Sequence, residues 1–272
     1  MKTTNEAAAP SARMSRRPLS HARALLILWL LIALYIANFA ALSVLQNLAF
    51  ETGAADLGNM NQAAWRTLHM GYPADTFSGE VAPRAGGHVE PAFYLLALPY
   101  ALHQSANMLL VIQTVVVALG AIAAYMLARD VLGGEGAGLA FALVYLLVPS
   151  LQAAVLTEFH PVALAAPLVL FAFYYLQQRS LARFLIFALL AMSVKEDMAL
   201  LVVMLGLYAL VAPAPAGERR RMRLAGVATI MLGVAWFVVT VYLIIPRFSP
   251  SGDNVLFERY AEVGGSPQGL VR

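Results

Sequence analysis

Three short segments of this chain carry side chains that could do chemistry together. They are TEFHP at residues 157–161, VKEDM at residues 194–198 and GGHVEP at residues 86–91. In the first segment, Glu158 and His160 are two residues apart, so they could share one metal ion, or one could orient the other for proton transfer. The alternative is a hydrogen-bonded polar turn in front of Pro161, because proline often starts a helix. The spacing therefore identifies candidates and leaves their chemistry open.

The second segment places three consecutive charges, Lys195, Glu196 and Asp197, between two apolar stretches of about 12 and 15 residues. Stretches this short bring the charges to the hydrocarbon boundary of a membrane, where ionisable groups are costly and tend to pair or to serve a function. The functional interpretation is a cation that binds phosphate with carboxylates close by. The structural interpretation is a lysine–carboxylate pair that neutralises itself within a helix bundle.

The composition predicts that these segments belong to a helical membrane protein. Hydrophobic residues make up 61% of the chain and charged residues 12%, and several apolar runs are long enough to form membrane-spanning helices. The chain has no cysteine, which excludes disulfides, thiol catalysis and cysteine-bound metal. The net charge of +3 comes from basic residues beside apolar runs, so it does not indicate nucleic-acid binding.

The apolar runs predict an all-α polytopic membrane protein with about seven transmembrane helices. The predicted helices are residues 24–45, 107–128, 137–156, 161–176, 183–194, 198–212 and 224–245. A further run at 91–102 rises only about 18 Å as a helix, short of a hydrocarbon core of about 30 Å, so we expect it to lie in the interface. With that choice, 12 of the 18 lysines and arginines lie on the side of the N-terminus, whereas a crossing at 91–102 would divide them equally. The positive-inside rule therefore favours a cytoplasmic N-terminus and an external C-terminus.

This topology predicts a basic cytoplasmic tail (1–23), a transmembrane domain (24–245) with a large external loop (46–106), and an external C-terminal segment (246–272). All three chemistry-bearing segments then face outward. Within the loop, residues 56–69 place apolar side chains on one helical face and polar side chains on the other, which predicts an amphipathic helix at the membrane interface. Asp56 stands at the start of that helix, where capping is an alternative to catalysis.

Several motifs resemble those of known membrane proteins. ADLGNMNQAAW, HVEP and TEFHP are similar to an uncharacterised family of bacterial predicted membrane proteins. The order of one span, a large loop that opens with an acidic residue, and closely spaced spans resembles the N-terminal half of the GT-C superfamily of membrane glycosyltransferases; GGHVEPAFYLLALPYAL, YMLARDVLGG and VPSLQAAVL look like the segment after its first loop helix. The resemblance covers roughly residues 24–212. Many members have an acidic pair where Asp56 stands alone, and about eleven or more spans, so a truncated or partial product is an alternative.

The resemblance implies a bacterial plasma-membrane enzyme that moves a sugar, with inversion, from a polyprenyl-phosphate donor to an unidentified acceptor at the non-cytoplasmic face. Asp56 then matches a catalytic base or metal ligand, and Glu158 matches a second acid. The expected catalytic residues, which are also the candidate ligands of a divalent cation, are Asp56, Glu158 and His160. The expected substrate-binding residues are Arg84, His88, Glu90, Lys195, Glu196, Asp197 and Arg247.

The other expected partner is the lipid bilayer, and no nucleic acid is expected. Arg84 could equally be a surface residue or a lipid-headgroup contact. Two competing hypotheses are a multi-pass transporter or flippase that uses residues 195–197, and a non-catalytic truncated member of the fold. The chain has no internal repeat and few charges within its apolar runs, which favours chemistry at the surface over transport.

Overall fold

The computed structural model describes residues 19–76, 79–250 and 252. Most of the predicted tail (1–23) and most of the predicted C-terminal segment (246–272) lie outside these residues. The described chain is all-α, as predicted, apart from one short antiparallel pair of strands in which Ala74 lies opposite Pro83 and Asp75 opposite Ala82.

The regular elements follow one another closely along the chain. The helices are α1 (His21–Leu48), α2 (Asn59–Met70), α3 (Ala92–Tyr100), α4 (Ala106–Leu132), α5 (Glu135–Leu147), α6 (Pro149–Leu156), α7 (Ala165–Gln177), α8 (Leu181–Val194), α9 (Met198–Val211), α10 (Ala216–Val239) and α11 (Ile245–Phe248). The strands are β1 (Ala74–Asp75) and β2 (Ala82–Pro83). Single π-helical turns form η1 (Ala54–Gly58) and η4 (Thr240–Ile244), and 3-10 turns form η2 (Arg84–Gly86) and η3 (Pro161–Leu164).

Three to four of these helices are long and apolar enough to cross a membrane. Three single helices meet this criterion, at His21–Leu48, Ala106–Leu132 and Ala216–Phe248. The fourth candidate is α5 together with α6, which bend by 46° where Pro149 begins the second helix. The other predicted spans correspond to shorter apolar helices. For example, α8 has 14 residues and rises about 21 Å, because the charged turn at 195–197 separates it from α9. Length alone therefore does not establish seven spans.

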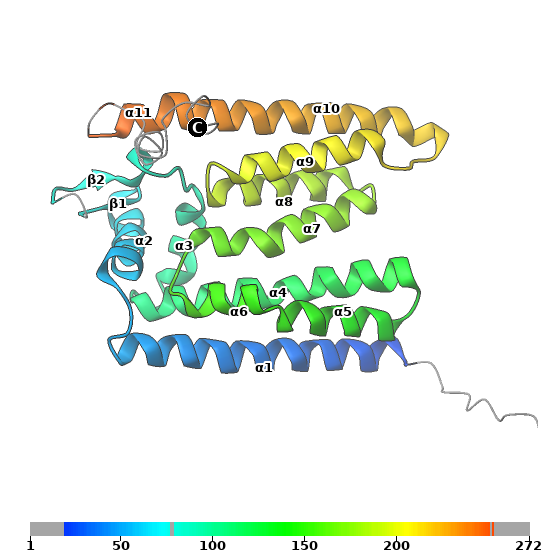
Figure 1. Cartoon of the computed structure of the whole chain (residues 1–272), viewed down its shortest axis with the longest axis horizontal. Helices are drawn as coiled ribbons and strands as arrows, with labels where there is room; N and C mark the ends of the chain where they lie inside the picture. Colours follow the sequence, from blue (N-terminus) through cyan, green and yellow to red (C-terminus); the bar gives the residue numbers. More distant parts are fainter. Residues whose placement is uncertain (1–18, 77–78, 251, 253–272) are drawn as a thin grey trace, which may run out of the picture.

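The long helices run back and forth beside one another, and the loop elements gather at one end (Figure 1). Helices α1, α4 and α5 pack together, helices α7 to α10 form a second group, and α4 contacts α7 between the groups. Helices α2 and α3, the two strands and the turn between α8 and α9 lie at the same end. This arrangement brings the three chemistry-bearing segments together.

Three apolar clusters hold the fold together. One joins α1, α4 and α5, and a second joins α7 to α10. The third lies between the loop and the bundle, where the fully buried Phe93 and Tyr100 of α3 pack with Leu109 of α4 and with Phe159. On the outer side of the bundle, large apolar side chains such as Leu34 and Met231 are exposed, which is the pattern expected of surfaces that face lipid.

The two loop helices lie close to the ranges that the sequence predicts, with one difference at the start of the first. Helix α2 begins at Asn59, after the π-helical turn, and its N-cap is Gly58, which makes no side-chain capping bond. The alternative role of Asp56 as the helix cap is therefore wrong. Asp56 lies within the preceding turn, and its side chain is free to face elsewhere.

Helices α9 and α10 approach so closely that their backbones touch. A Cβ atom on Gly206 would lie 2.9 Å from the carbonyl oxygen of Gly226, and a Cβ on Gly226 would lie 2.8 Å from the carbonyl oxygen of Gly206. Such distances require both residues to lack a side chain. Small residues at a helix interface are a common way to pack helices within a membrane.

Replacing Gly226 with alanine should destabilise the protein, because the added methyl group meets backbone atoms that cannot move aside. We expect a loss of about 1–3 kcal/mol in unfolding free energy, the usual cost of overpacking. The matched control is Gly217→Ala in the same helix, where a Cβ meets nothing within 4 Å. Thermal unfolding in detergent measures both variants, and equal midpoints would contradict the close α9–α10 contact.

Candidate functional site

A cavity of about 500 Å³ lies at the end of the bundle where the loop elements gather. Its volume is in the range of small-molecule binding sites. It brings together six of the ten predicted site residues, which are Asp56, Arg84, His88, Glu90, His160 and Lys195. The other four predicted residues do not line it.

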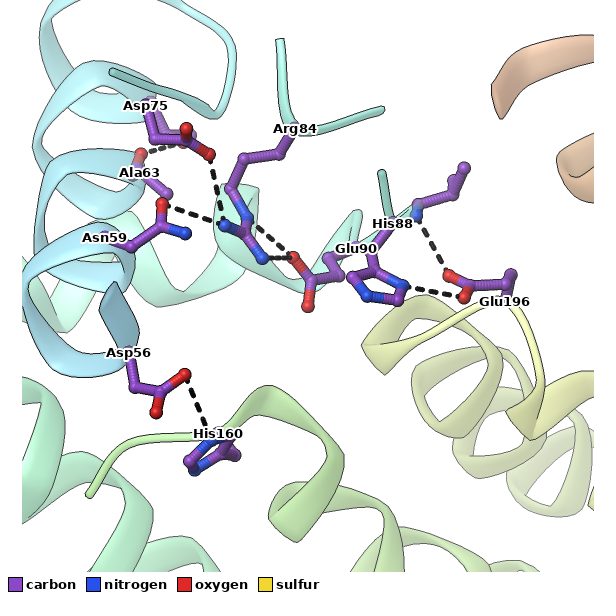
Figure 2. A network of polar contacts seen from close by, with 11 residues as sticks. Asp56, Asn59, Ala63, Asp75, Arg84, His88, Glu90, His160 and Glu196 are labelled. Carbon is purple, nitrogen blue, oxygen red and sulfur yellow. Dashed lines mark hydrogen bonds and ion pairs between the residues drawn. The ribbon is translucent and has the colours of Figure 1, made fainter. Parts of the chain in front are cut away.

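Asp56 and His160 face each other across part of the cavity (Figure 2). Oδ1 of Asp56 is 3.9 Å from Nε2 of His160, too far for a hydrogen bond but close enough for electrostatic attraction when the ring is protonated. The Asp56 side chain is 61% exposed, the most open of the acidic groups in this ion-pair network. The two residues are thus placed to act on the same ligand.

The carboxylate of Glu158 turns toward the backbone of the first loop. Its two oxygens accept hydrogen bonds from the N–H groups of Gly53 at 2.7 Å and Leu57 at 2.9 Å. The residue has a positive φ of 76°, an uncommon conformation for a side chain of this size. These bonds position the turn that carries Asp56.

A metal centre made of Asp56, Glu158 and His160 does not fit this geometry. The carboxylate of Glu158 already accepts two backbone N–H groups and does not line the cavity. Across residues 19–76 and 79–250, no group of three or more histidine or acidic side chains is arranged to hold a metal ion.

Gln113, in the third turn of α4, holds the segment that carries His160. Its side chain is completely buried, and its amide nitrogen donates to the carbonyl oxygens of Ala154 and Glu158 at 3.1 and 2.7 Å. Its amide oxygen accepts the N–H of His160 at 2.8 Å. Sequence reasoning missed this residue, although one glutamine inside an apolar run is a signal for an interhelical hydrogen bond.

Arg84 is buried and fully engaged with the protein (Figure 2). It is 7% exposed, and its Nε and one terminal nitrogen each lie 2.7 Å from the same oxygen of Glu90. Its other terminal nitrogen donates to Asn59 at 3.0 Å and to Asp75 at 3.3 Å. The guanidinium also lies 5.7 Å from the ring centre of Phe93. Arg84 therefore joins four parts of the loop, and the alternative of an exposed headgroup contact does not agree with its burial.

Glu196 links the first loop to the turn between α8 and α9. It is 2% exposed, and its two oxygens accept hydrogen bonds from Nδ1 of His88 at 2.9 Å and from the N–H of Val89 at 3.0 Å. Burial alone would raise the pKa of this carboxyl, but the hydrogen bonds and the charge of His88 outweigh burial and hold the pKa below its usual value. Glu196 is thus an ionised, buried anchor.

The remaining predicted residues lie at the edge of the site. Lys195 lines the cavity and pairs with Asp197 at 3.7 Å, which agrees with the structural interpretation of the charged segment. Arg247 is exposed on α11, outside the residues that line the cavity. Helix α11 nevertheless packs against η2. The two approach so closely that a Cβ atom added to Gly86 would overlap the carbonyl oxygen of Phe248.

Replacing Arg84 with lysine should destabilise the loop even though the charge is kept. A single ammonium cannot reach Glu90, Asp75 and Asn59 together, so buried acceptors lose their donors. We expect the unfolding free energy to fall by about 2 kcal/mol. The control is Arg66→Lys on α2, whose guanidinium contacts only the sulfur of Met70 among the described residues, at 3.5 Å. Equal losses in the two variants would contradict a structural role for Arg84.

Replacing Glu196 with glutamine should remove a contribution to stability that depends on pH. Because the folded pKa lies below the ordinary value of 4.5, the ionised carboxylate stabilises the wild type fully above that value. The contribution is lost as the pH falls through the lower folded pKa. Unfolding midpoints of wild type and Glu196→Gln should therefore differ by a constant amount near neutral pH and converge as the pH falls well below 4.5. A gap that stays the same at every pH would contradict this assignment.

Comparison with known proteins agrees with the membrane architecture. A family model described as "Predicted membrane protein (DUF2079)" matches residues 44–271, which include every segment that lines the cavity. No curated protein matches the chain, and no solved structure matches it. Because the family match covers most of the sequence, the chain belongs to the DUF2079 family of predicted membrane proteins.

Proposed function

We propose that this protein is an inverting membrane glycosyltransferase, which moves a sugar from a polyprenyl-phosphate donor to an acceptor hydroxyl at the non-cytoplasmic face. The observation that carries the proposal is the placement of Asp56. Its exposed carboxylate faces a cavity of about 500 Å³ at the end of an apolar bundle, and its one ionic partner among the described residues is His160 at 3.9 Å. Such a carboxylate is available to accept a proton.

In the proposed topology, seven segments cross the membrane and the cavity opens on the non-cytoplasmic side. The crossing segments are α1, α4, α5 with α6, η3 with α7, α8, α9 and α10. Their alternating directions support this assignment (Figure 1). The four arginines at residues 219–223 begin α10 at the end opposite the cavity, as the positive-inside rule requires of a cytoplasmic end.

In the proposed reaction, the acceptor hydroxyl gives its proton to Asp56 while its oxygen bonds to the anomeric carbon. The bond between that carbon and the phosphate oxygen breaks, and the electron pair leaves with the polyprenyl phosphate. Inversion requires only one base on the side opposite the leaving group, so a single aspartate is sufficient. His160 would orient the Asp56 carboxylate, and Glu158 would hold the turn beneath it.

Lys195 is the cation best placed to bind the donor phosphate. It lines the cavity and pairs with the half-exposed Asp197 at 3.7 Å, a long contact from which the lysine can turn to a ligand. Arg84 also lines the cavity, but its charge is already balanced by Glu90 and Asp75. We therefore assign Arg84 and Glu90 to the support of the site and Lys195 to contact with the substrate.

The competing hypothesis of a transporter or flippase requires polar groups along a path through the bundle. The charged groups of residues 195–197 instead lie at one end and are engaged with the loop or with one another. No observation specifically favours transport. If the purified protein transfers no sugar, the hypothesis of a non-catalytic member of the fold is supported instead.

Replacing Asp56 with asparagine should lower transfer by about 10²–10⁴-fold, the usual contribution of a general base. The measurement is transfer of labelled sugar from a panel of polyprenyl-phosphate sugars by the full chain in lipid vesicles. The control is Glu51→Gln, which changes an exposed acid of the same loop that does not line the cavity.

Turnover by Asp56→Asn at the wild-type rate would reject Asp56 as the base. Absence of turnover with every donor, for folded wild-type protein, would reject the transferase assignment itself.

A further inference from the structure

His88 is held in one orientation by a buried carboxylate. Glu196 accepts one hydrogen bond from Nδ1 of His88 and another from the backbone N–H of the next residue, Val89. Glu196 therefore binds the loop at two adjacent residues. A carboxylate that is 2% exposed needs donors for both oxygens, since an unsatisfied buried charge is very costly. Nδ1 of His88 therefore carries a hydrogen.

The other ring nitrogen of His88 is the one that the protein leaves for a ligand. His88 lines the cavity with its side chain 22% exposed, and Nε2 has no partner within residues 19–76 and 79–250. A histidine ring that donates Nδ1–H to a carboxylate can also donate a hydrogen from Nε2 to an anion, because both ring nitrogens are donors when the ring carries two hydrogens. Figure 2 shows this ring between Glu90 and Glu196.

The carboxylates beside the ring already have partners within the protein. Glu90 pairs with Arg84 on its far side, and the two oxygens of Glu196 accept hydrogen bonds from His88 and Val89. Lys195, the neighbour of Glu196 in the chain, adds a second cation to the same cavity. The other charged groups that line the cavity are Asp56, Asp75 and His160. Asp75 is paired with Arg84, and Asp56 lies beside His160.

We infer that His88, oriented by Glu196, donates a hydrogen bond from Nε2 to a phosphate group bound in the cavity, with Lys195 as the second cation. The identity of this phosphate as that of a polyprenyl donor rests on the proposed function; the phosphate subsite itself does not. During transfer, the electron pair of the broken carbon–oxygen bond would go to the phosphate oxygen that faces His88. His88 then contacts the substrate, whereas Glu196 is a positioning residue.

Binding of farnesyl phosphate, a short polyprenyl phosphate, tests the subsite without turnover. The full chain in phosphatidylcholine nanodiscs is titrated with farnesyl phosphate, with inorganic phosphate and with farnesol. Because one charge-assisted hydrogen bond is lost, His88→Gln should weaken farnesyl phosphate binding about tenfold, and Lys195→Gln should do the same. Farnesol binding should not change. The matched control is His103→Gln, an exposed histidine outside the cavity, which should bind like the wild type.

The two sources of phosphate give different results. If the lipid-linked phosphate is the ligand, farnesyl phosphate binds more tightly than inorganic phosphate and both depend on His88. If a free phosphate is the ligand, the farnesyl chain adds no affinity, while the dependence on His88 remains. Equal binding of farnesyl phosphate by His88→Gln and wild type would overturn the inference.

A measurement on the wild type keeps the test valid if a variant does not fold. In ¹⁵N-histidine-labelled protein, the Nε2 resonance of His88 should move on saturation with farnesyl phosphate, while that of His103 should not. An unchanged His88 resonance at saturation would overturn the inference.

The role of Glu196 is tested by the pH dependence of binding. Glu196→Gln can still hydrogen-bond but cannot stabilise a protonated ring, so it should lose farnesyl phosphate at a lower pH than the wild type does. Glu196→Asp keeps the charge and should restore most of the wild-type profile. Identical profiles for wild type and Glu196→Gln would assign Glu196 to structure alone and reject its positioning role.

Failure of the inference and failure of the proposed function are distinguishable. Binding that depends on His88, without transfer by the wild type, would keep the phosphate subsite and reject the transferase. Transfer that depends on Asp56, with full activity and full binding in His88→Gln, would keep the transferase and reject the subsite.

Discussion

The structure depends on the pairing of three carboxylates at the end of an apolar bundle. Glu158 accepts backbone N–H groups of residues 53 and 57, Glu196 binds His88 and Val89, and Glu90 binds Arg84. A carboxylate removed from water is tolerated only when donors replace the water. Each of these pairs also joins segments of the chain, and two of them join the first loop to residues about a hundred positions away. The donors that make the burial of these carboxylates tolerable therefore also fix the position of the loop.

That pairing also determines which polar groups remain for chemistry. The loop helices contribute apolar side chains to a cluster shared with α4, so the loop is packed as well as bonded. Once Arg84, Glu90, Glu158 and Glu196 are engaged, the groups that still face the cavity with partly exposed side chains are Asp56, His88, His160 and Lys195. One is an anion and three are able to carry positive charge. This combination suits a ligand with both a hydroxyl group and a phosphate.

Much of the helical architecture could be predicted from sequence, because apolar runs and their flanking charges are local signals. The helices overlap the predicted ranges, several of them extending a few residues beyond, and most of the candidate residues gather at one end. The number of spans could not be established in this way, because α8 and α9 are each shorter than the hydrocarbon core. The separate roles of the acidic residues could not be predicted either. Whether Glu158 faces a cavity or a backbone N–H is decided by a contact with residues 53 and 57, which no local pattern encodes.

The short helices have a physical consequence for the proposed chemistry. Helix α1 has 28 residues and α8 has 14, so the turn after α8 cannot extend as far from the bundle centre as the long helices do if all of them cross the same membrane. Charges at 195–197 would then lie near the hydrocarbon boundary, where an unpaired ion is costly. Donors from the loop reduce that cost for Glu196, and Lys195 is left beside the cavity. A phosphate carried on a lipid reaches this depth without leaving the membrane, whereas a free sugar phosphate must be desolvated to do so. In the proposed topology, the position of this turn is therefore compatible with the lipid-linked phosphate of the proposed function.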